Sequence, residues 1–187
     1  SELQHRSRNL LGIVSSVASR TIGKGGSAED FEDRLAALSR AQGLLSRFGS
    51  DTVELEVLVR AELEAHGDLG PPKVTVDGPS VSLTVAQVQT FALALHELAT
   101  NAVKYGALKG EAGQLSITWT VEADAGAVRS LHLDWIESGL RLDPEAGTRR
   151  GYGRELIERA LTYSLGARTE YALKPDGAQC RIQMPLD

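Results

Sequence analysis

The spacing of apolar residues changes near residue 50. Before that point, apolar or small residues recur at steps of three and four, which is typical of α-helices that pack along one face. This spacing predicts a helix over 2–22 and a second from 28 to about 47, joined by the Gly-rich segment 23–26. Ser27 followed by Asp30 matches a capping box at the start of the second helix. The two apolar seams comprise Leu3, Leu10, Val14, Val17 and Thr21, then Phe31, Leu35, Leu38, Gln42 and Leu45.

The predicted hairpin cannot be stable alone, because two helices bury too little apolar surface. The simplest partner is a second copy of the hairpin, which would form a four-helix bundle. We therefore expect a homodimer through residues 2–47. A monomer that packs the hairpin on the rest of its own chain remains the alternative.

Beyond residue 50, helical spacing alternates with the period of two that is typical of half-buried strands. The predicted fold class is α+β: an N-terminal antiparallel helical hairpin (1–50) followed by an α/β sandwich with a mixed sheet (51–187). The predicted elements are a short helix over 55–63, brief strands at 74–76 and 81–83 around the Gly78-Pro79 turn, a long helix from Val85 to about Tyr105 capped by Thr84, strands at 115–121 and 131–135, a helix after Gly153, and a closing hairpin over 169–184.

Composition narrows the class of protein. Hydrophobic residues make up 42% and charged residues 24% of the 187 residues, which is ordinary for a globular protein and excludes intrinsic disorder. No apolar run approaches the ~18 residues of a membrane-spanning helix, so we expect none in this segment. The single cysteine, Cys180, fits a reducing compartment, and we expect a cytoplasmic location. The net charge of −5 argues against a nucleic-acid-binding surface.

The chain begins at Ser1, and its single methionine is Met184. We therefore expect that a natural N-terminal part precedes this segment.

The helix 85–105 has a polar face. Glu97, Asn101 and Lys104 lie within about 60° of one another, opposite the apolar side. An amide and a carboxylate suit Mg²⁺, and an amine suits phosphate, so this face fits a magnesium nucleotide. The alternative is a polar face that simply contacts water.

Two further features fit a nucleotide. Glu137 has the same strand parity as the apolar Leu131, Leu133 and Trp135, so it is expected on the core side, where an acid needs a partner such as a purine amine. The alternative is that Glu137 faces water at the strand end. Gly151 and Gly153 precede a helix whose N-terminus could approach phosphate, with Arg150 beside them. The alternative here is an ordinary loop-to-helix turn.

His5 lies about 200° from the first seam, so we expect it to be exposed. Arg6 and Arg8 flank it, and an exposed imidazole beside arginines can accept a phosphoryl group. The alternative is a surface histidine without a role. We interpret His66 and His132 as incidental.

Together these features resemble the HWE subfamily of sensor histidine kinases. The similarity spans nearly the whole chain, and the motifs occur in the family's order. The matching motifs are the phosphoacceptor box around His5, the N box from His96 to Gly106, the W-x-E element Trp135-Ile136-Glu137, and the second glycine box Gly151-Tyr152-Gly153. Where the family commonly continues W-x-E with x-Gly-Gly-Pro, this chain has Ser138-Gly139-Leu140-Arg141.

The resemblance implies a dimerisation and phosphotransfer hairpin followed by a Bergerat-type (GHKL) domain that binds ATP and Mg²⁺. His5 would be the phosphoacceptor. Asn101 would bind Mg²⁺, and Glu97 would act as metal ligand or base. The remaining nucleotide contacts would come from Lys104, Tyr105, Glu137, Gly139, Arg150, Gly151 and Gly153.

The function implied is that of a bacterial, ATP-dependent protein-histidine kinase of a two-component system. It would autophosphorylate on His5 and pass the phosphoryl group to an aspartate of a response-regulator receiver domain. The family usually carries a sensor domain upstream. The alternative is a non-kinase histidine phosphotransferase with a degenerate nucleotide domain.

Overall fold

A computed structural model describes residues 2–22, 25–49, 51–67, 73–123, 126, 128–141 and 152–186. The elements are α1 (Glu2–Ile22), α2 (Ala28–Phe48), β1 (Thr52–Glu54), α3 (Leu55–Glu64), β2 (Val74–Asp77), β3 (Ser82–Thr84), α4 (Val85–Tyr105), β4 (Gln114–Ala123), β5 (Arg129–Ser138), α5 (Tyr152–Leu165), β6 (Arg168–Lys174) and β7 (Gly177–Pro185).

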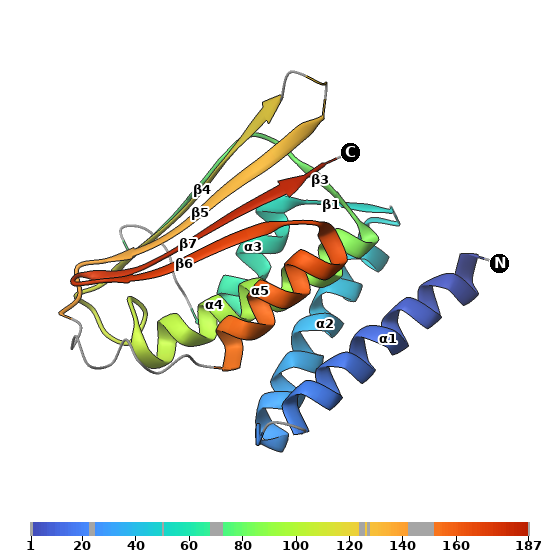
Figure 1. Cartoon of the computed structure of the whole chain (residues 1–187), viewed down its shortest axis with the longest axis horizontal. Helices are drawn as coiled ribbons and strands as arrows, with labels where there is room; N and C mark the ends of the chain where they lie inside the picture. Colours follow the sequence, from blue (N-terminus) through green and yellow to red (C-terminus); the bar gives the residue numbers. More distant parts are fainter. Residues whose placement is uncertain are drawn as a thin grey trace.

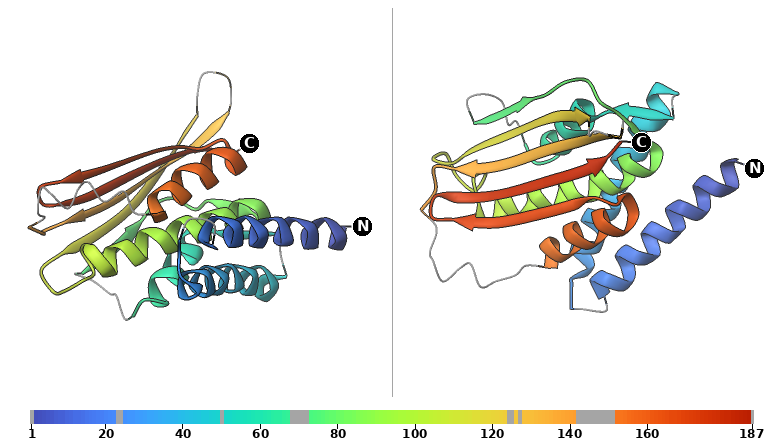
Figure 2. Two further views of the ribbon diagram at one scale, coloured as in Figure 1. Left: turned by 60° about the horizontal axis from the view of Figure 1, so that its bottom comes forward. Right: turned by 45° about the horizontal axis from the view of Figure 1, so that its top comes forward.

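These elements form three layers. The main sheet has the order β2-β4-β5-β7-β6, in which β2 is parallel to β4 and the other pairs are antiparallel. The helices lie on one side of this sheet, with α4 and α5 next to it and α1 and α2 farther out (Figures 1 and 2). The predicted α+β class, with a helical hairpin and a mixed sheet, is confirmed.

Two capping boxes fix the starts of α2 and α4. Ser27 and Asp30 exchange side-chain and backbone hydrogen bonds, as the sequence predicts. The Thr84 hydroxyl accepts a hydrogen bond from the Gln87 backbone N–H, while the Gln87 side-chain oxygen accepts one from the Thr84 backbone N–H. Each box satisfies backbone donors that a helix start otherwise leaves unpaired.

The core lies between the sheet and α4. Ile117, Trp135 and Cys180 are register neighbours on three adjacent strands, and all three are fully buried. Phe91 and Leu98 of α4 are buried in the same core cluster. This packing fixes which face of α4 points away from the sheet, and therefore where its polar residues lie.

The structure contains one strand that the apolar pattern does not predict. This strand, β1, pairs with β3 in a separate two-stranded sheet. The strands on either side of Gly78-Pro79 therefore belong to different sheets. The Trp119 ring packs against Gly78, where a side chain would overlap it, and its indole N–H donates to the Pro79 carbonyl at 2.7 Å.

The hairpin packs on its own chain. Val17 of α1, Leu38 of α2 and Leu93 of α4 form a buried apolar cluster. The structure thus shows the contact that the monomer alternative requires. A homodimer through residues 2–47 stays a prediction.

Within the described part of the chain, no helix combines the length and hydropathy that crossing a membrane requires.

Candidate active site

The polar face of α4 meets the hairpin. Glu97 is only 5% exposed, Asn101 is half-buried and Lys104 is exposed. The interpretation of this face as merely water-facing is therefore wrong for Glu97. A buried carboxylate needs a partner, and α2 provides it.

That partner is Arg34 of α2, itself buried. Its Nε donates to Glu97 Oε1 at 2.6 Å, and another guanidinium nitrogen donates to Thr21 Oγ1 at 2.8 Å. The Thr21 hydroxyl in turn donates to the Val17 carbonyl at 2.7 Å. A buried polar chain thus links α1, α2 and α4.

Sequence reasoning missed Arg34, although a signal was present. Arg34 lies three residues after Phe31 and four before Leu38, both of which belong to the apolar seam. A charged residue on a buried face needs an opposite charge. The pattern could therefore have indicated a buried ion pair, but not its partner.

Lys104 makes a weaker ionic contact with the hairpin. Its Nζ lies 3.9 Å from Asp30 Oδ1, and both side chains are well exposed. Such surface pairs contribute little stability, so Lys104 can turn toward another anion at small cost.

The carboxylate of Glu137 is buried beneath the C-terminal end of α4. Glu137 is 4% exposed, as its strand parity predicts, and the alternative that it faces water is wrong. Oε1 accepts from the Ala107 amide at 2.9 Å, and Oε2 accepts from the Trp135 indole N–H at 3.1 Å. Each oxygen keeps a second lone pair. The purine amine therefore stays a prediction.

Glycines allow this arrangement. A Cβ on Gly106 would overlap the Glu137 carboxylate, and a Cβ on Gly177 would overlap the Glu137 carbonyl. Gly139, two residues after Glu137, has a left-handed φ of +76°. Only glycine adopts that conformation at no steric cost.

Burial raises the pKa of Glu137, although its two hydrogen bonds oppose the shift. A folded-state pKa above the ordinary 4.5 means that the folded chain binds a proton more readily than the unfolded chain. Stability therefore falls as the pH rises through the folded-state value. Below 4.5 both states are protonated, and the contribution levels off.

We therefore expect Glu137→Gln to flatten part of the pH dependence of stability. The free energy of unfolding of the natural chain, minus that of the variant, should fall as the pH rises from 4.5 toward neutrality. Urea unfolding at several pH values measures this difference. A difference that rises with pH would contradict the assignment. Glu170→Gln, on an exposed position of β6, is the control.

The structure describes the remaining predicted site residues only in part. His5 and Gly153 lie in the backbones of α1 and α5, but their side chains or surroundings fall outside the described part. Arg150 and Gly151 lie wholly outside the described residues. Tyr105 is 69% exposed at the end of α4, and its adenine contact stays a prediction.

His66, which we interpret from the sequence as incidental, lies beside a residue of the N box. It is half-buried after α3, and its ring centroid lies 5.6 Å from that of His96. His132 is half-exposed on β5, 3.6 Å from Glu122.

Comparison with known proteins relates this chain to histidine kinases. A family model described as HWE histidine kinase matches residues 2–80. The blue-light-activated histidine kinase of Brucella anthropi is 31% identical over 99% of this chain, and that of Brucella ovis is 30% identical. The chain spans 38% of the length of these relatives.

Solved structures show the same fold. The histidine kinase domain of the Erythrobacter litoralis EL346 blue-light-activated histidine kinase matches with a TM-score of 0.65 at 18% identity, covering 99% of this chain and 89% of that one. A second structure of the EL346 protein matches with a TM-score of 0.70 at 17% identity, covering 99% of this chain and 59% of that one.

Proposed function

Because the chain belongs to the HWE histidine kinase family, we propose that it is an ATP-dependent protein-histidine kinase of a two-component system. The observation that carries this proposal is the meeting of α2 with the polar face of α4. The hairpin that bears His5 is thus packed beside the residues expected to bind Mg–ATP.

Asn101 fits a magnesium ligand as it stands. It is half-buried on α4, one turn after Glu97, and offers a neutral, hard oxygen. Mg²⁺, when bound, would neutralise charge on the phosphates during transfer. Lys104 is exposed beside it and would contact phosphate.

Glu97 fits the site only after a change at the hairpin. Its Oε1 is held by Arg34 at 2.6 Å, so in this arrangement the Arg34 charge competes with any metal ion or proton that the carboxylate would bind. A shift of α2 that withdraws Arg34 would release it. We infer that the described arrangement is a resting one, and that the hairpin moves before His5 is phosphorylated.

The adenine end would be formed by Glu137, Gly139 and Tyr105. Glu137 is supported by its burial and by the lone pairs that remain on its oxygens. Arg150, Gly151 and Gly153 would contact the phosphates near the start of α5.

In the proposed reaction, a ring nitrogen of neutral His5 attacks the γ-phosphorus of ATP in line. The N–P bond forms as the bond to the ADP oxygen breaks, and the imidazole proton passes to a base, for which Glu97 is the candidate. Catalysis of this kind depends mainly on positioning and charge neutralisation. The phosphoryl group then passes to an aspartate of a response-regulator receiver domain. An upstream sensor domain would govern the reaction.

The alternative is a phosphotransferase that relays phosphoryl groups without using ATP. Such a protein has no need of a magnesium ligand, whereas this chain retains Asn101 and the two glycines of the second glycine box, Gly151 and Gly153. These residues favour the kinase.

The source of the phosphoryl group separates the two functions. We expect the chain, incubated alone with Mg²⁺ and γ-labelled ATP, to acquire acid-labile, alkali-stable label. Omitting Mg²⁺ should prevent labelling. A chain that takes label only from a phosphorylated receiver domain would be a relay, and the kinase proposal would be wrong.

A further inference from the structure

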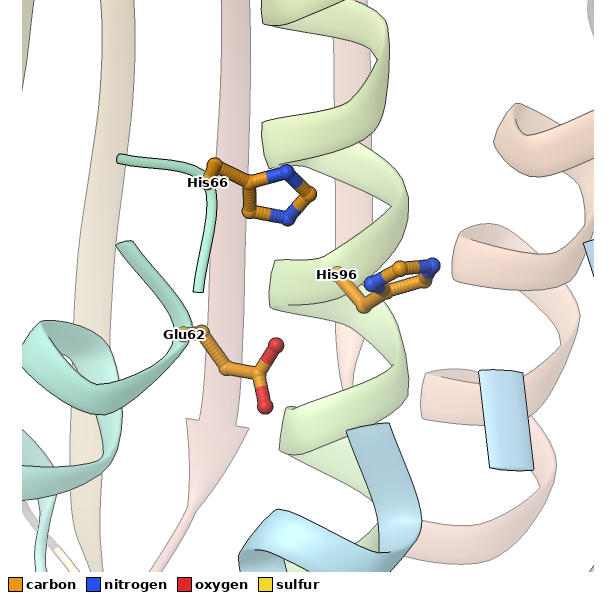
Figure 3. Close-up of side chains that lie close together, drawn as sticks. All are labelled: Glu62, His66 and His96. Atoms are coloured by element: carbon orange, nitrogen blue, oxygen red, sulfur yellow. The ribbon is translucent and has the colours of Figure 1, made fainter. Parts of the chain in front are cut away.

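Three possible metal ligands lie close together between α3 and α4, and one of them, His96, directly precedes Glu97 of the Arg34 pair. Glu62 lies on α3, His66 just after it, and His96 on α4. One ligand atom from each residue lies within 4.8 Å of the other two. Figure 3 shows the Glu62 carboxylate and the His66 ring directed toward α4, with the His96 side chain beside them.

Among the described residues, two ring nitrogens of this cluster have no hydrogen-bond partner. They are His66 Nε2 and His96 Nδ1, and both atoms are buried. His96 as a whole is 6% exposed. A buried polar atom without a partner is costly, and a ligand can relieve that cost.

The protonation state of the two histidines favours a metal, whereas burial raises the pKa of Glu62 despite the hydrogen bonds from Arg40. Burial lowers the pKa of both imidazoles, that of His96 to about 4, and the nearby Arg40 adds to the effect. Both rings are therefore neutral near pH 7, and a neutral imidazole offers the lone pair that a metal ion needs.

We propose that Glu62, His66 and His96 form a binding site for a transition-metal ion of the Zn²⁺ class. Zinc takes nitrogen ligands at about 2.0–2.1 Å and carboxylate oxygens at about 2.0–2.2 Å. The three ligand atoms, which lie within 4.8 Å of one another, would have to move closer together to bind one ion at these distances. Two imidazoles select such an ion over Mg²⁺, which prefers oxygen ligands.

A neighbouring cavity of about 270 Å³ leaves room for a further ligand. His66 and His96 line it together with Asp33, Thr100 and Lys104. Water or an added ligand could complete the coordination from this side. The site is thus built from the catalytic domain but borders α2.

Arg40 of α2 is the competing cation. It donates to both oxygens of Glu62, at 3.2 and 2.9 Å. Its side chain is about one-third exposed, so it can turn toward solvent. A metal ion would replace Arg40 as the partner of Glu62 and would thereby remove one contact that holds α2 to α3.

The test is a titration of the whole, chelator-treated chain with Co²⁺ as a spectroscopic probe, followed by competition with Zn²⁺. No nucleotide is present, so the outcome is independent of kinase activity. We expect one ion per chain with ligand-field bands, and release of Co²⁺ by Zn²⁺. His66→Ala and His96→Ala should each weaken binding at least about 100-fold, since even residues that only support a ligand contribute 10–100-fold.

His132→Ala is the matched control and should bind as the natural chain does. Arg40→Gln provides a second test that leaves all three ligands in place, and it should bind more tightly because the competing charge is gone. Absence of a one-to-one complex, loss of binding in His132→Ala, or unchanged or weaker binding in Arg40→Gln would each overturn the proposal.

Discussion

Asn101→Ala is expected to abolish Mg²⁺-dependent ATP binding and, with it, self-labelling. Asn101 is half-buried on α4 and supplies a neutral amide oxygen to the proposed Mg²⁺ site. Alanine preserves the helix but removes that oxygen. The loss in affinity should be at least about 100-fold, since residues that merely support a metal ligand contribute 10–100-fold.

The measurement is calorimetric titration with a non-hydrolysable ATP analogue, with and without Mg²⁺. Gln114→Ala removes an exposed amide from β4 and serves as the control. Equal, Mg²⁺-dependent affinity in Asn101→Ala and the natural chain would exclude Asn101 as the metal ligand. Far-UV circular dichroism would show that both variants remain folded.

Arg34→Met is expected to destabilise the chain by about 3–5 kcal/mol, because it leaves the buried Glu97 carboxylate without its cation. Methionine fills much of the same space, so little of the loss comes from a cavity. The double variant Arg34→Met/Glu97→Met should recover most of the stability, since apolar replacement of both partners is often neutral.

Urea unfolding gives the free energy of each variant and the coupling between the two residues. Arg60→Met is the control, because Arg60 pairs with Glu56 four residues away on an exposed helix face. Such a pair contributes no more than about 0.5 kcal/mol. An Arg34→Met loss as small as that of the control would contradict the buried ion pair.

The sequence was sufficient to predict most elements of the fold. Steps of three and four located α1, α2 and α4, and alternation located β4 and β5, because each pattern directly reflects which face is buried. The capping box at Ser27 was equally readable, since its partners are only three residues apart. Strand parity also predicted correctly that Glu137 is buried.

Partners distant in sequence were not predictable. The spacing of apolar residues in a helix and their alternation in a strand indicate that a residue is buried, but not which residue it contacts. Arg34 could have been recognised as buried, yet nothing local identifies Glu97 as its partner. The strand β1 is not predictable for the same reason, because three residues carry too little pattern and its partner β3 is separated from it by α3 and β2. The contact of His66 with His96 likewise depends on how α3 packs against α4.

The location of the phosphoryl group tests the central claim most directly. The chain contains four histidines, at positions 5, 66, 96 and 132. After incubation with Mg²⁺ and γ-labelled ATP, we expect acid-labile label on the natural chain and on His132→Gln, and none on His5→Gln. Undiminished label on His5→Gln would contradict the account, because the acceptor would then be another residue.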